Sequence, residues 1–383
     1  MKKILIINTK YREYGGEDSN IIEEQKFLSE KYEVQYLEYD NSDTITINDV
    51  FSLFLANNRK SNAILSEKLK DFDPDLVYVH NTWFKANLGV FSTIKSFNIP
   101  IILKIHNFRY ACSNTYLMSK HLNGDKFCFK CGLANSNKIF NKYFDKSYLK
   151  SYFLIHYGKK YINLLKKLEI KILVMTEFQK EYMKNLGVSS KKIHIYPNPI
   201  SSKQLPNSSY NSNSDYVVYA GRISEPKGLE NLIKAWNNSE NENMKLKIIG
   251  DGDILKSLQQ NVKNINIEFL GKKSNSESLD LIKNARAVVT ATKMFEGQPR
   301  LLCEASFMEV PSIFPDFGGM AEFFPENYML KFEQYNYVDL TKKLNLLQQT
   351  DLLKNISIDV KKYLEDKISE TIVHKKFKEI VNE

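Results

Sequence analysis

Short apolar runs, each followed by a helical pattern, recur through the second half of this chain and constrain its fold most strongly. The runs are DYVVYAG, KLKIIGDGD, INIEFLGKK and RAVVTAT, at residues 215–221, 245–253, 265–273 and 286–292. Short runs of apolar and β-branched residues are typical of strands buried on both faces. Because strands that alternate with helices form parallel sheets, the sequence predicts an α/β fold with a doubly wound parallel sheet.

The chain begins with a similar pattern. The apolar part of MKKILIIN (1–8) is too short for the core of a secretion signal, so it predicts a first buried strand. The next loop contains Gly15 and Gly16 and leads into a helix expected to begin near Glu17 or Asp18. Glycine lets a backbone approach a phosphate there, although a simple tight turn explains two glycines equally well.

Two further predicted strands each end at a histidine. DPDLVYVHNTW (73–83) and IPIILKIHNFRYAC (99–112) place His80 and His106 at the carboxyl ends of parallel strands. Ligands of open α/β sheets bind at that edge. A lone histidine there is more often a structural hydrogen-bonding residue, so the pattern alone leaves both roles open.

The length of 383 residues exceeds one usual core and indicates two domains. Residues 201–214, SSKQLPNSSYNSNS, are rich in Ser and Asn without an apolar period, which indicates a linker. We therefore expect an N-terminal domain over 1–200 and a C-terminal domain over 215–367. A final helix is expected over 368–383.

The net charge of +9 is concentrated in one third of the chain. Residues 81–200 hold 20 Lys and Arg against five Asp and Glu, a net +15. Within this third, residues 138–168 interleave aromatic and aliphatic side chains with lysines, a pattern typical of a helix on a membrane surface. A helix face packed on the core is an equal alternative. Nucleic-acid binding is disfavoured because no recognition motif accompanies the lysines, and no apolar run is long enough to span a membrane.

Two glutamates eight positions apart, Glu296 and Glu304, stand across the start of one expected helix. That helix should run from about Pro299 to Met308, with Glu296 in the loop before it. Eight residues at helical rise span roughly 12 Å, which is close to the span from the sugar ring to the ribose of a nucleotide-sugar. The spacing therefore suits a ligand held at both ends.

Groups that can bind an anion lie near these glutamates in the expected sheet. The backbone N–H groups of Gly297, Gln298 and Arg300 and the positive end of the helix would face a diphosphate. Arg222 and Lys227 follow another strand at its carboxyl end, where two cations can neutralise the same anion. Lysines on loops are usually only solvated, which is the alternative for either cation alone.

Glu304 is expected on the inward side of its helix. Leu301, Ala305 and Met308 are its apolar neighbours at helical spacing. An unpaired carboxylate on that side is costly, and ligand hydroxyl groups would offset the cost. The alternative is an ordinary solvated glutamate.

Five motifs occur in a fixed order: AGRISEPKG (220–228), IGDG (249–252), FLG (269–271), EGQPRLLCEA (296–305) and FGGMAE (317–322). Through them the chain resembles the GT-B glycosyltransferases, specifically the large retaining group 4, also called glycosyl transferases group 1, of the capsule, O-antigen and exopolysaccharide type. The resemblance covers nearly the whole chain.

The resemblance implies two Rossmann-like domains that face a central cleft, with the last helix crossing back to the N-terminal domain. It implies that Arg222 and Lys227 stabilise the departing diphosphate, that Glu296 orients the hexose and that Glu304 holds the ribose. His106 matches the family's N-domain histidine, which contacts the transferred sugar, and His80 is the weaker choice.

The family also carries a glycine-rich loop at Gly15 and Gly16, which favours the phosphate-binding interpretation. The complete expected donor-binding set is Gly15, Gly16, Arg222, Lys227, Glu296, Gly297, Gln298, Arg300 and Glu304. Gln298 replaces the aromatic or aliphatic residue of many members, so the donor hexose stays open.

Two clusters raise the question of a metal. Asp71, Asp73 and Asp75 precede a strand with a proline between them, which is typical of turn chemistry. The other cluster has the spacing of a Cys3His zinc site and consists of Cys112, His121, Cys128 and Cys131. Family members with a similar cysteine trio lack the histidine, so we expect no metal, and the zinc question stays open. Cys303 is expected in the core.

We therefore expect a retaining, metal-independent glycosyltransferase without a cofactor. It would move a hexose from a nucleotide-diphosphate sugar to a glycan acceptor, lipid-linked, in the synthesis of a cell-surface polysaccharide such as capsule or lipopolysaccharide. It would be cytoplasmic and peripheral at the inner face of the membrane. The alternatives are a nucleotide-sugar epimerase on the same fold and an inactive donor-binding subunit that partners an active enzyme.

Overall fold

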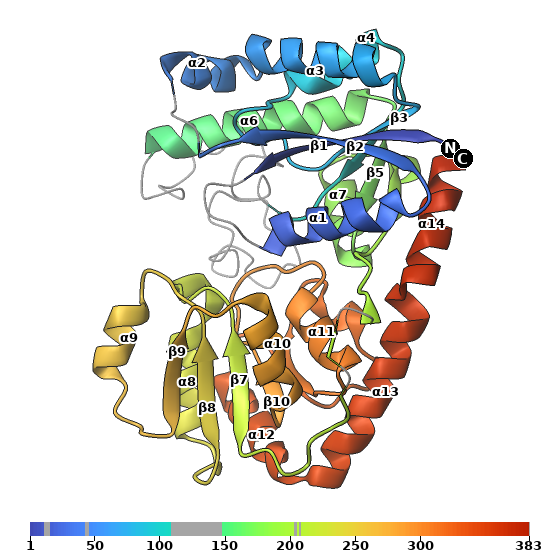
Figure 1. The fold of residues 1–383 in the computed structure, drawn as a ribbon. Coiled ribbons are helices and arrows are strands. Elements are labelled where there is room, and N and C mark those ends of the chain that lie inside the picture. Colours follow the sequence, from blue (N-terminus) through green and yellow to red (C-terminus); the bar gives the residue numbers. More distant parts are fainter. Residues whose placement is uncertain (11–15, 43–45, 109–147, 203–204, 207, 383) are drawn as a thin grey trace. The chain divides into compact units, whose positions relative to one another are not determined.

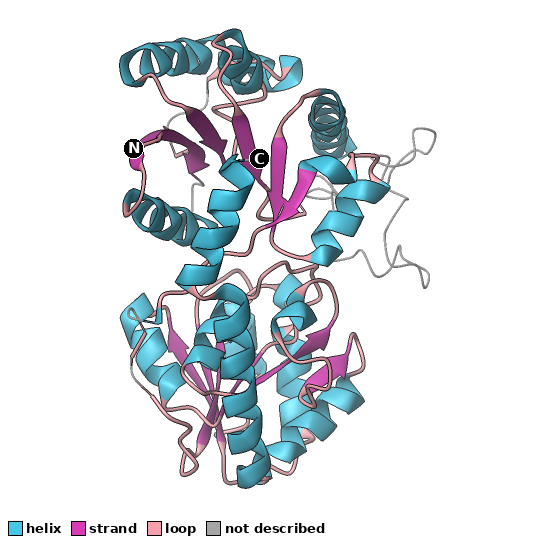
Figure 2. Ribbon diagram, turned by 90° about the vertical axis from the view of Figure 1, so that its right-hand side faces the viewer, coloured by secondary structure: helices cyan, strands magenta, loops and turns pink. Residues whose placement is uncertain are grey.

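The computed structural model describes residues 1–10, 16–42, 46–108, 148–202, 205–206 and 208–382. The chain forms two compact units, Met1–Asn198 and Pro199–Glu383. Each unit contains one six-stranded sheet (Figure 1), and all the paired strands are parallel. Helices cover both faces of each sheet (Figure 2). The predicted doubly wound α/β fold is confirmed.

The N-terminal unit has the strand order β2-β1-β3-β4-β5-β6. Its strands are β1 Lys3–Lys10, β2 Glu33–Asp40, β3 Leu76–Val79, β4 Ile101–Lys104, β5 Lys171–Val174 and β6 Ile193–Ile195. Its helices are α1 Gly16–Ser29, α2 Ile47–Leu55, α3 Arg59–Phe72, α4 Gly89–Ser96, α6 Tyr148–Lys167, α7 Glu177–Asn185 and the 3-10 turn η2 Ser190–Lys192. The strand order reverses beside β1, whose neighbours are β2 and β3.

The C-terminal unit has the strand order β12-β11-β10-β7-β8-β9. Its strands are β7 Tyr216–Ala220, β8 Lys245–Ile249, β9 Ile267–Gly271, β10 Ala287–Val289, β11 Ser312–Asp316 and β12 Lys331–Glu333. Its α-helices are α8 Leu229–Asn237, α9 Leu255–Asn261, α10 Asn275–Lys283, α11 Arg300–Phe307, α12 Tyr337–Asn345, α13 Thr350–Ile368 and α14 Glu370–Asn382. Its 3-10 turns are η4 Glu225–Lys227, η5 Met320–Phe323 and η6 Leu346–Gln348. The order reverses between β7 and β10.

Both cores follow from the apolar runs in the sequence. The side chains of β3, β4 and β10 are all buried, as expected for strands covered by helices on both faces. Because the side chains of a buried strand are mostly apolar, polar residues lie in the loops at its ends. Ligands of open α/β sheets bind beside the loops that follow the carboxyl ends.

Helix boundaries lie close to those expected. Helix α11 begins at Arg300 with Pro299 as its N-cap and ends at Phe307. Helix α1 begins at Gly16, and Gly15 lies outside the described residues. Asp73 caps the C-terminus of α3 in a left-handed conformation, with φ of 48°, which confirms its expected role in a turn.

The expected linker is attached to the C-terminal unit. Ser208 Oγ donates a hydrogen bond of 2.6 Å to the carbonyl of Met308, and the guanidinium of Arg286 donates to the carbonyl of Ser212. The final helix is separated from α13 at Ser369, so α14 is an element of its own.

Candidate functional site

The loops after β7 and β10 lie side by side where the strand order of the C-terminal sheet reverses. Lys293 N donates to the carbonyl of Pro226 at 2.8 Å. Gly228 has φ of +69°, and a Cβ atom there would stand 2.0 Å from the carbonyl oxygen of Ala291. Only glycine allows this approach of the two backbones. The contact fixes both loops at the position where open α/β sheets bind ligands.

Lys227 and Glu296 meet across these loops. Lys227 Nζ lies 2.6 Å from Glu296 Oε1, and both side chains are a little under one third exposed. Thr292 Oγ1 donates to the same carboxylate oxygen at 3.3 Å. The sequence predicted both residues for the site but not their pairing. The ion pair holds a cation and a carboxylate at the carboxyl ends of β7 and β10, and these groups can bind an anion and hydroxyl groups.

Glu304 is 5% exposed on α11, which confirms its expected inward side. Its carboxylate has a partner within the protein, because Arg300 Nε donates a hydrogen bond to Glu304 Oε1 at 2.7 Å. This i,i+4 pair offsets part of the cost of burying the charge. Arg300, expected to offer its backbone N–H to an anion, thus also orients the glutamate through its side chain.

The N-cap residue of α11, Pro299, makes no side-chain cap hydrogen bond, and the N-terminus of a helix attracts anions. Gly297, between Glu296 and this helix, is buried, and Gln298 is half-buried. Gly318 packs behind them, since a Cβ there would lie 3.0 Å from the carbonyl oxygen of Glu296. The backbone near Glu296 is therefore closely packed on its own sheet.

Arg222 follows β7 and is exposed. Tyr219 Oη donates to its carbonyl oxygen at 2.9 Å, which fixes the backbone. Within the part of the chain that the structure describes, no ion pair engages its guanidinium. Arg222 is thus a second cation beside the Lys227 loop, and unlike Lys227 it is not neutralised in advance.

Cys303 lies on α11 beside this site and is fully buried. Burial, and then the neighbouring Glu304 carboxylate, raise the pKa of its thiol. A protonated, buried thiol packs like a small apolar side chain, so the expected core role is confirmed.

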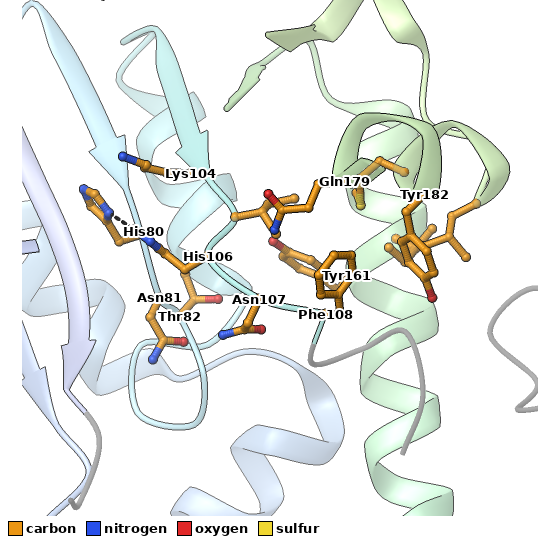
Figure 3. A pocket seen from close by; sticks show the side chains of 14 residues that line it. His80, Asn81, Thr82, Lys104, His106, Asn107, Phe108, Tyr161, Gln179 and Tyr182 are labelled. Atoms are coloured by element: carbon orange, nitrogen blue, oxygen red, sulfur yellow. Dashed lines mark hydrogen bonds between the residues drawn. The ribbon is translucent and has the colours of Figure 1, made fainter. Parts of the chain in front are cut away.

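In the N-terminal unit, His80 and His106 contact each other directly. His80 follows β3 and His106 follows β4, and these strands are neighbours. His80 Nδ1 and His106 Nε2 are 2.8 Å apart (Figure 3). Burial is the first cause that lowers both pKa values well below the ordinary value, and Lys104 acts in the same direction. The rings are therefore a neutral pair with one shared hydrogen bond.

The outer nitrogens of the pair, His80 Nε2 and His106 Nδ1, are buried without a hydrogen-bond partner among the residues that the structure describes. A neutral imidazole carries one N–H, so the shared bond decides whether His106 Nδ1 is a donor or an acceptor. His80 thus sets the character of the polar atom that His106 can offer to a ligand.

Lys104 lies behind the histidines in a buried ion pair. Its Nζ is 2.8 Å from Glu24 Oε2, and both side chains are at most 1% exposed. Tyr78 Oη donates to the other oxygen of Glu24 at 2.7 Å. Burial lowers the pKa of Lys104, while the Glu24 carboxylate acts in the opposite direction. A buried pair satisfied in this way fixes the end of β4, and with it His106.

A cavity of 60 Å³ opens in front of the pair. Figure 3 shows His80 and His106 on one side of it and Tyr161, Gln179 and Tyr182, from α6 and α7, on the other. Gln179 Oε1 accepts from Met175 N at 2.8 Å, and its Nε2 is buried without a partner in the described part of the chain. The cavity therefore combines apolar walls with two polar atoms that a ligand could engage.

Sequence reasoning missed several of these residues. Lys104 carried a signal, because a lysine at the end of an apolar strand is unusual in a core. Glu24 and Thr292 carried none, since their partners lie on other elements. Three expectations fall wholly or partly outside the described residues: Gly15, residues 138–147 of the basic segment, and the cysteine cluster with the four residues Cys112, His121, Cys128 and Cys131.

Known proteins resemble this chain in sequence and in fold. Residues 202–374 match the protein family described as Glycosyl transferases group 1. The chain is 26% identical over 195 residues to the amylovoran biosynthesis glycosyltransferase AmsD of Erwinia amylovora, covering 49% of this chain and 55% of the relative. It is 26% identical over 265 residues to an uncharacterized glycosyltransferase of Methanocaldococcus jannaschii, covering 65% and 57%. The chain thus spans little more than half the length of either curated relative.

Solved structures decide the fold. HepE of Anabaena, in complex with UDP and glucose, aligns over 100% of both chains with a TM-score of 0.69 at 14% identity. Sucrose-phosphate synthase from Thermosynechococcus elongatus aligns over 100% of this chain and 98% of its own, with a TM-score of 0.74 at 12% identity. The fold is GT-B. With the family match to the C-terminal half, it supports a GT-B glycosyltransferase.

Proposed function

We propose that this chain is a retaining glycosyltransferase that moves a hexose from a nucleotide-diphosphate sugar to a glycan acceptor. The observation that carries the proposal is the Lys227–Glu296 pair, held at the reversal point of the C-terminal sheet beside an uncapped helix. A cation, a carboxylate and the N-terminus of a helix at one strand edge are what a sugar diphosphate requires. The family match over residues 202–374 supports it.

The donor is a nucleotide-diphosphate sugar, held by the glycine loop at Gly15 and Gly16 and by the C-terminal set. Glu304, fixed by Arg300, accepts hydrogen bonds from the ribose hydroxyls, and Glu296 orients the hexose. The complexes of HepE with UDP, and with UDP and glucose, favour UDP as the nucleotide. Gln298 lines the hexose end and is the first position to test for sugar specificity.

Catalysis rests on charge stabilisation. Arg222 and Lys227 face the diphosphate as negative charge develops on the departing oxygen, and such preorganised electrostatics is usually the largest catalytic contribution. With the cations supplied by the protein, the reaction proceeds without a divalent metal or a cofactor. Attack on the same face as departure gives retention, and His106, set by His80, contacts the sugar.

The acceptor is a glycan that is lipid-linked, in the synthesis of a cell-surface polysaccharide such as capsule or lipopolysaccharide. The relative from Erwinia amylovora is named for amylovoran biosynthesis, which supports a polysaccharide product. In the part of the chain that the structure describes, no helix combines the length and hydropathy needed to cross a bilayer. We place the enzyme in the cytoplasm at the inner face of the membrane.

A direct test combines binding and product analysis. UDP, GDP and dTDP sugars are screened by thermal shift, because a ligand at 100 times its dissociation constant adds about 2.7 kcal/mol of stability. The stabilising donor is then incubated with membrane extracts, and the anomeric configuration of the product is read by NMR. Transfer with retention, undiminished by EDTA, supports the proposal. An epimerised donor sugar, or binding without any transfer, contradicts it.

A further inference from the structure

Helix α2 turns its apolar face outward. Val50, Phe51, Phe54 and Leu55 are between 44% and 65% exposed. Their spacing places all four on one side of the helix. Single exposed apolar residues are normal, but four large ones on a nine-residue helix form a contiguous patch, and such patches mark interaction sites.

The opposite side of α2 holds the helix to its own unit through polar contacts. Asp49 pairs with Lys85 at 3.3 Å, and Asn87 Nδ2 donates to the carbonyl of Ser52 at 2.9 Å. Thr46 and Asp49 form a capping box at the N-terminus. These contacts fix the orientation of α2, so its apolar face points outward in the folded unit and does not belong to the core.

Helix α6 extends this apolar face. The ring of Phe54 stacks on that of His156 with centroids 5.5 Å apart and meets Phe153 edge-on at 6.1 Å. Leu149 and Tyr152, one turn before, are exposed. Figure 1 shows α2 and α6 in the same part of the N-terminal unit, and the two helices are in contact.

The rim of the face is basic. Helix α6 contains five lysines and no Asp or Glu. Lys160 Nζ donates to the carbonyl of Phe54 at 2.9 Å and lies 5.7 Å from the centre of its ring. Partial burial, and then Lys160 and Lys159, lower the pKa of His156, whose ring stacks on Phe54.

We propose that α2 and the adjoining face of α6 dock this protein on an anionic phospholipid bilayer, with Phe51 and Leu55 inserted among the acyl chains. An apolar face bordered by lysines and an exposed tyrosine has the chemistry of a helix that lies in the membrane interface. The positive charge of α6, which contains no Asp or Glu, complements anionic headgroups. This inference deepens the membrane part of the proposed function and rests on it. It assigns the inserted side chains to α2 instead of to the basic segment 138–168.

The test uses the full chain and vesicles of phosphatidylcholine with or without phosphatidylglycerol. The variant Phe51→Gln with Leu55→Gln should reduce partitioning onto the anionic vesicles at least ~10-fold, since each side chain loses its burial in lipid. The control Ile265→Gln with Val338→Gln removes apolar residues that are 90% and 69% exposed in the C-terminal unit. The control should stay within about twofold of the parent. Equal loss in both variants, or no loss in the first, overturns the inference.

Insertion itself is read with Phe51→Trp. Its fluorescence should shift to the blue with anionic vesicles and be quenched by brominated acyl chains, whereas Val338→Trp should show neither change. A Phe51→Trp signal that brominated lipid leaves unquenched overturns the inference. So does a parent dimer in sedimentation that the first variant abolishes without changing vesicle binding, because the face would then join two copies.

Thermal shift with UDP separates this inference from the donor chemistry. The variant should keep the UDP response of the parent, since its changes lie in the other unit from the Lys227–Glu296 pair. If vesicle binding occurs but UDP binds neither protein, the donor assignment fails and the docking surface stands. If UDP stabilises both proteins but vesicles bind neither, the docking surface fails alone.

Discussion

The strand-end sites of the two units hold their side chains in opposite electrostatic states. In the N-terminal unit, His80 is buried and His106 is half-buried, and the two rings are neutral and joined by one hydrogen bond. In the C-terminal unit, Lys227 with Glu296 and Arg300 with Glu304 are charged pairs, and the first pair is open to solvent. The same doubly wound architecture thus carries one site with a pair of neutral rings and one site with two ion pairs.

This difference has a chemical consequence. A neutral pair beside an apolar cavity suits the hydroxyl groups of a sugar, because it offers hydrogen bonds without a fixed charge. A set of ion pairs suits a diphosphate, because the diphosphate can replace the carboxylate as the partner of the cation. In the proposed function, the assignment of the sugar to one site and of the diphosphate to the other therefore rests on burial as much as on residue type.

The largest expected effect concerns the cations of the ionic site. Arg222→Ala and Lys227→Ala should each lower kcat by ~10²-fold or more, because each removes a charge that faces the departing diphosphate. Steady-state kinetics with a saturating donor measures the change. Lys234→Ala, on the next helix of the same unit, is the control and should leave kcat unchanged. Activity within a few-fold of the parent in both variants would remove the cations from the site.

The next effect concerns the backbone that holds Lys227. Gly228 and Gly271 have nearly equal positive φ, +69° and +68°, but only Gly228 has a backbone carbonyl within reach of a Cβ atom. Gly271→Ala should cost about 1 kcal/mol of unfolding free energy. Gly228→Ala should cost about 3 kcal/mol because the clash is added. Urea unfolding of both variants checks the difference, and equal costs would show that the two loops are not closely packed.

The neutral site predicts a smaller effect, on pH dependence. Both histidines have pKa values lowered in the folded chain, so below pH 6.5 the unfolded chain binds protons that the folded chain does not. Stability should therefore be constant above that pH and fall below it, by roughly 1 kcal/mol per pH unit for each ring. Urea unfolding followed through Trp83, in a Trp236→Phe background, reports on this unit.

The matched variant for this measurement is His80→Asn with His106→Asn. It should lose most of the pH dependence between pH 6.5 and 5.5, whatever its stability at pH 7.5. A slope equal to that of the parent would mean that the rings are not held neutral, and the contrast between the two sites would fail.

The sequence predicted which residues lie in the loops at the strand ends but not which side chains meet. Buried strands are visible as apolar runs, so Lys227 and Glu296 could be placed at strand ends. Their pairing depends on β10 lying beside β7, and strand order is not written in local periodicity. The same holds for His80 and His106, which are 26 residues apart in the sequence.

Two other features show where the pattern was sufficient and where it was not. The spacing of Arg300 and Glu304 already allowed an i,i+4 ion pair. The outward face of α2 could not be predicted. The inward side chain of Asp49 is paired with Lys85, which lies 36 residues further along the chain. A local pattern cannot reveal a polar contact that reverses the usual orientation of a helix.

The central claim is that Glu304 holds the ribose while Glu296, paired with Lys227, holds the sugar. Isothermal titration of UDP and turnover of the UDP-sugar donor are compared for Glu304→Ala and Glu296→Ala. Glu304→Ala should bind UDP at least ~10-fold more weakly, because ribose hydroxyls lose a buried charged acceptor. Glu296→Ala should bind UDP no more weakly than the parent, since Lys227 loses its competing carboxylate, and should lose turnover. Equal loss of UDP affinity in both variants would contradict the account.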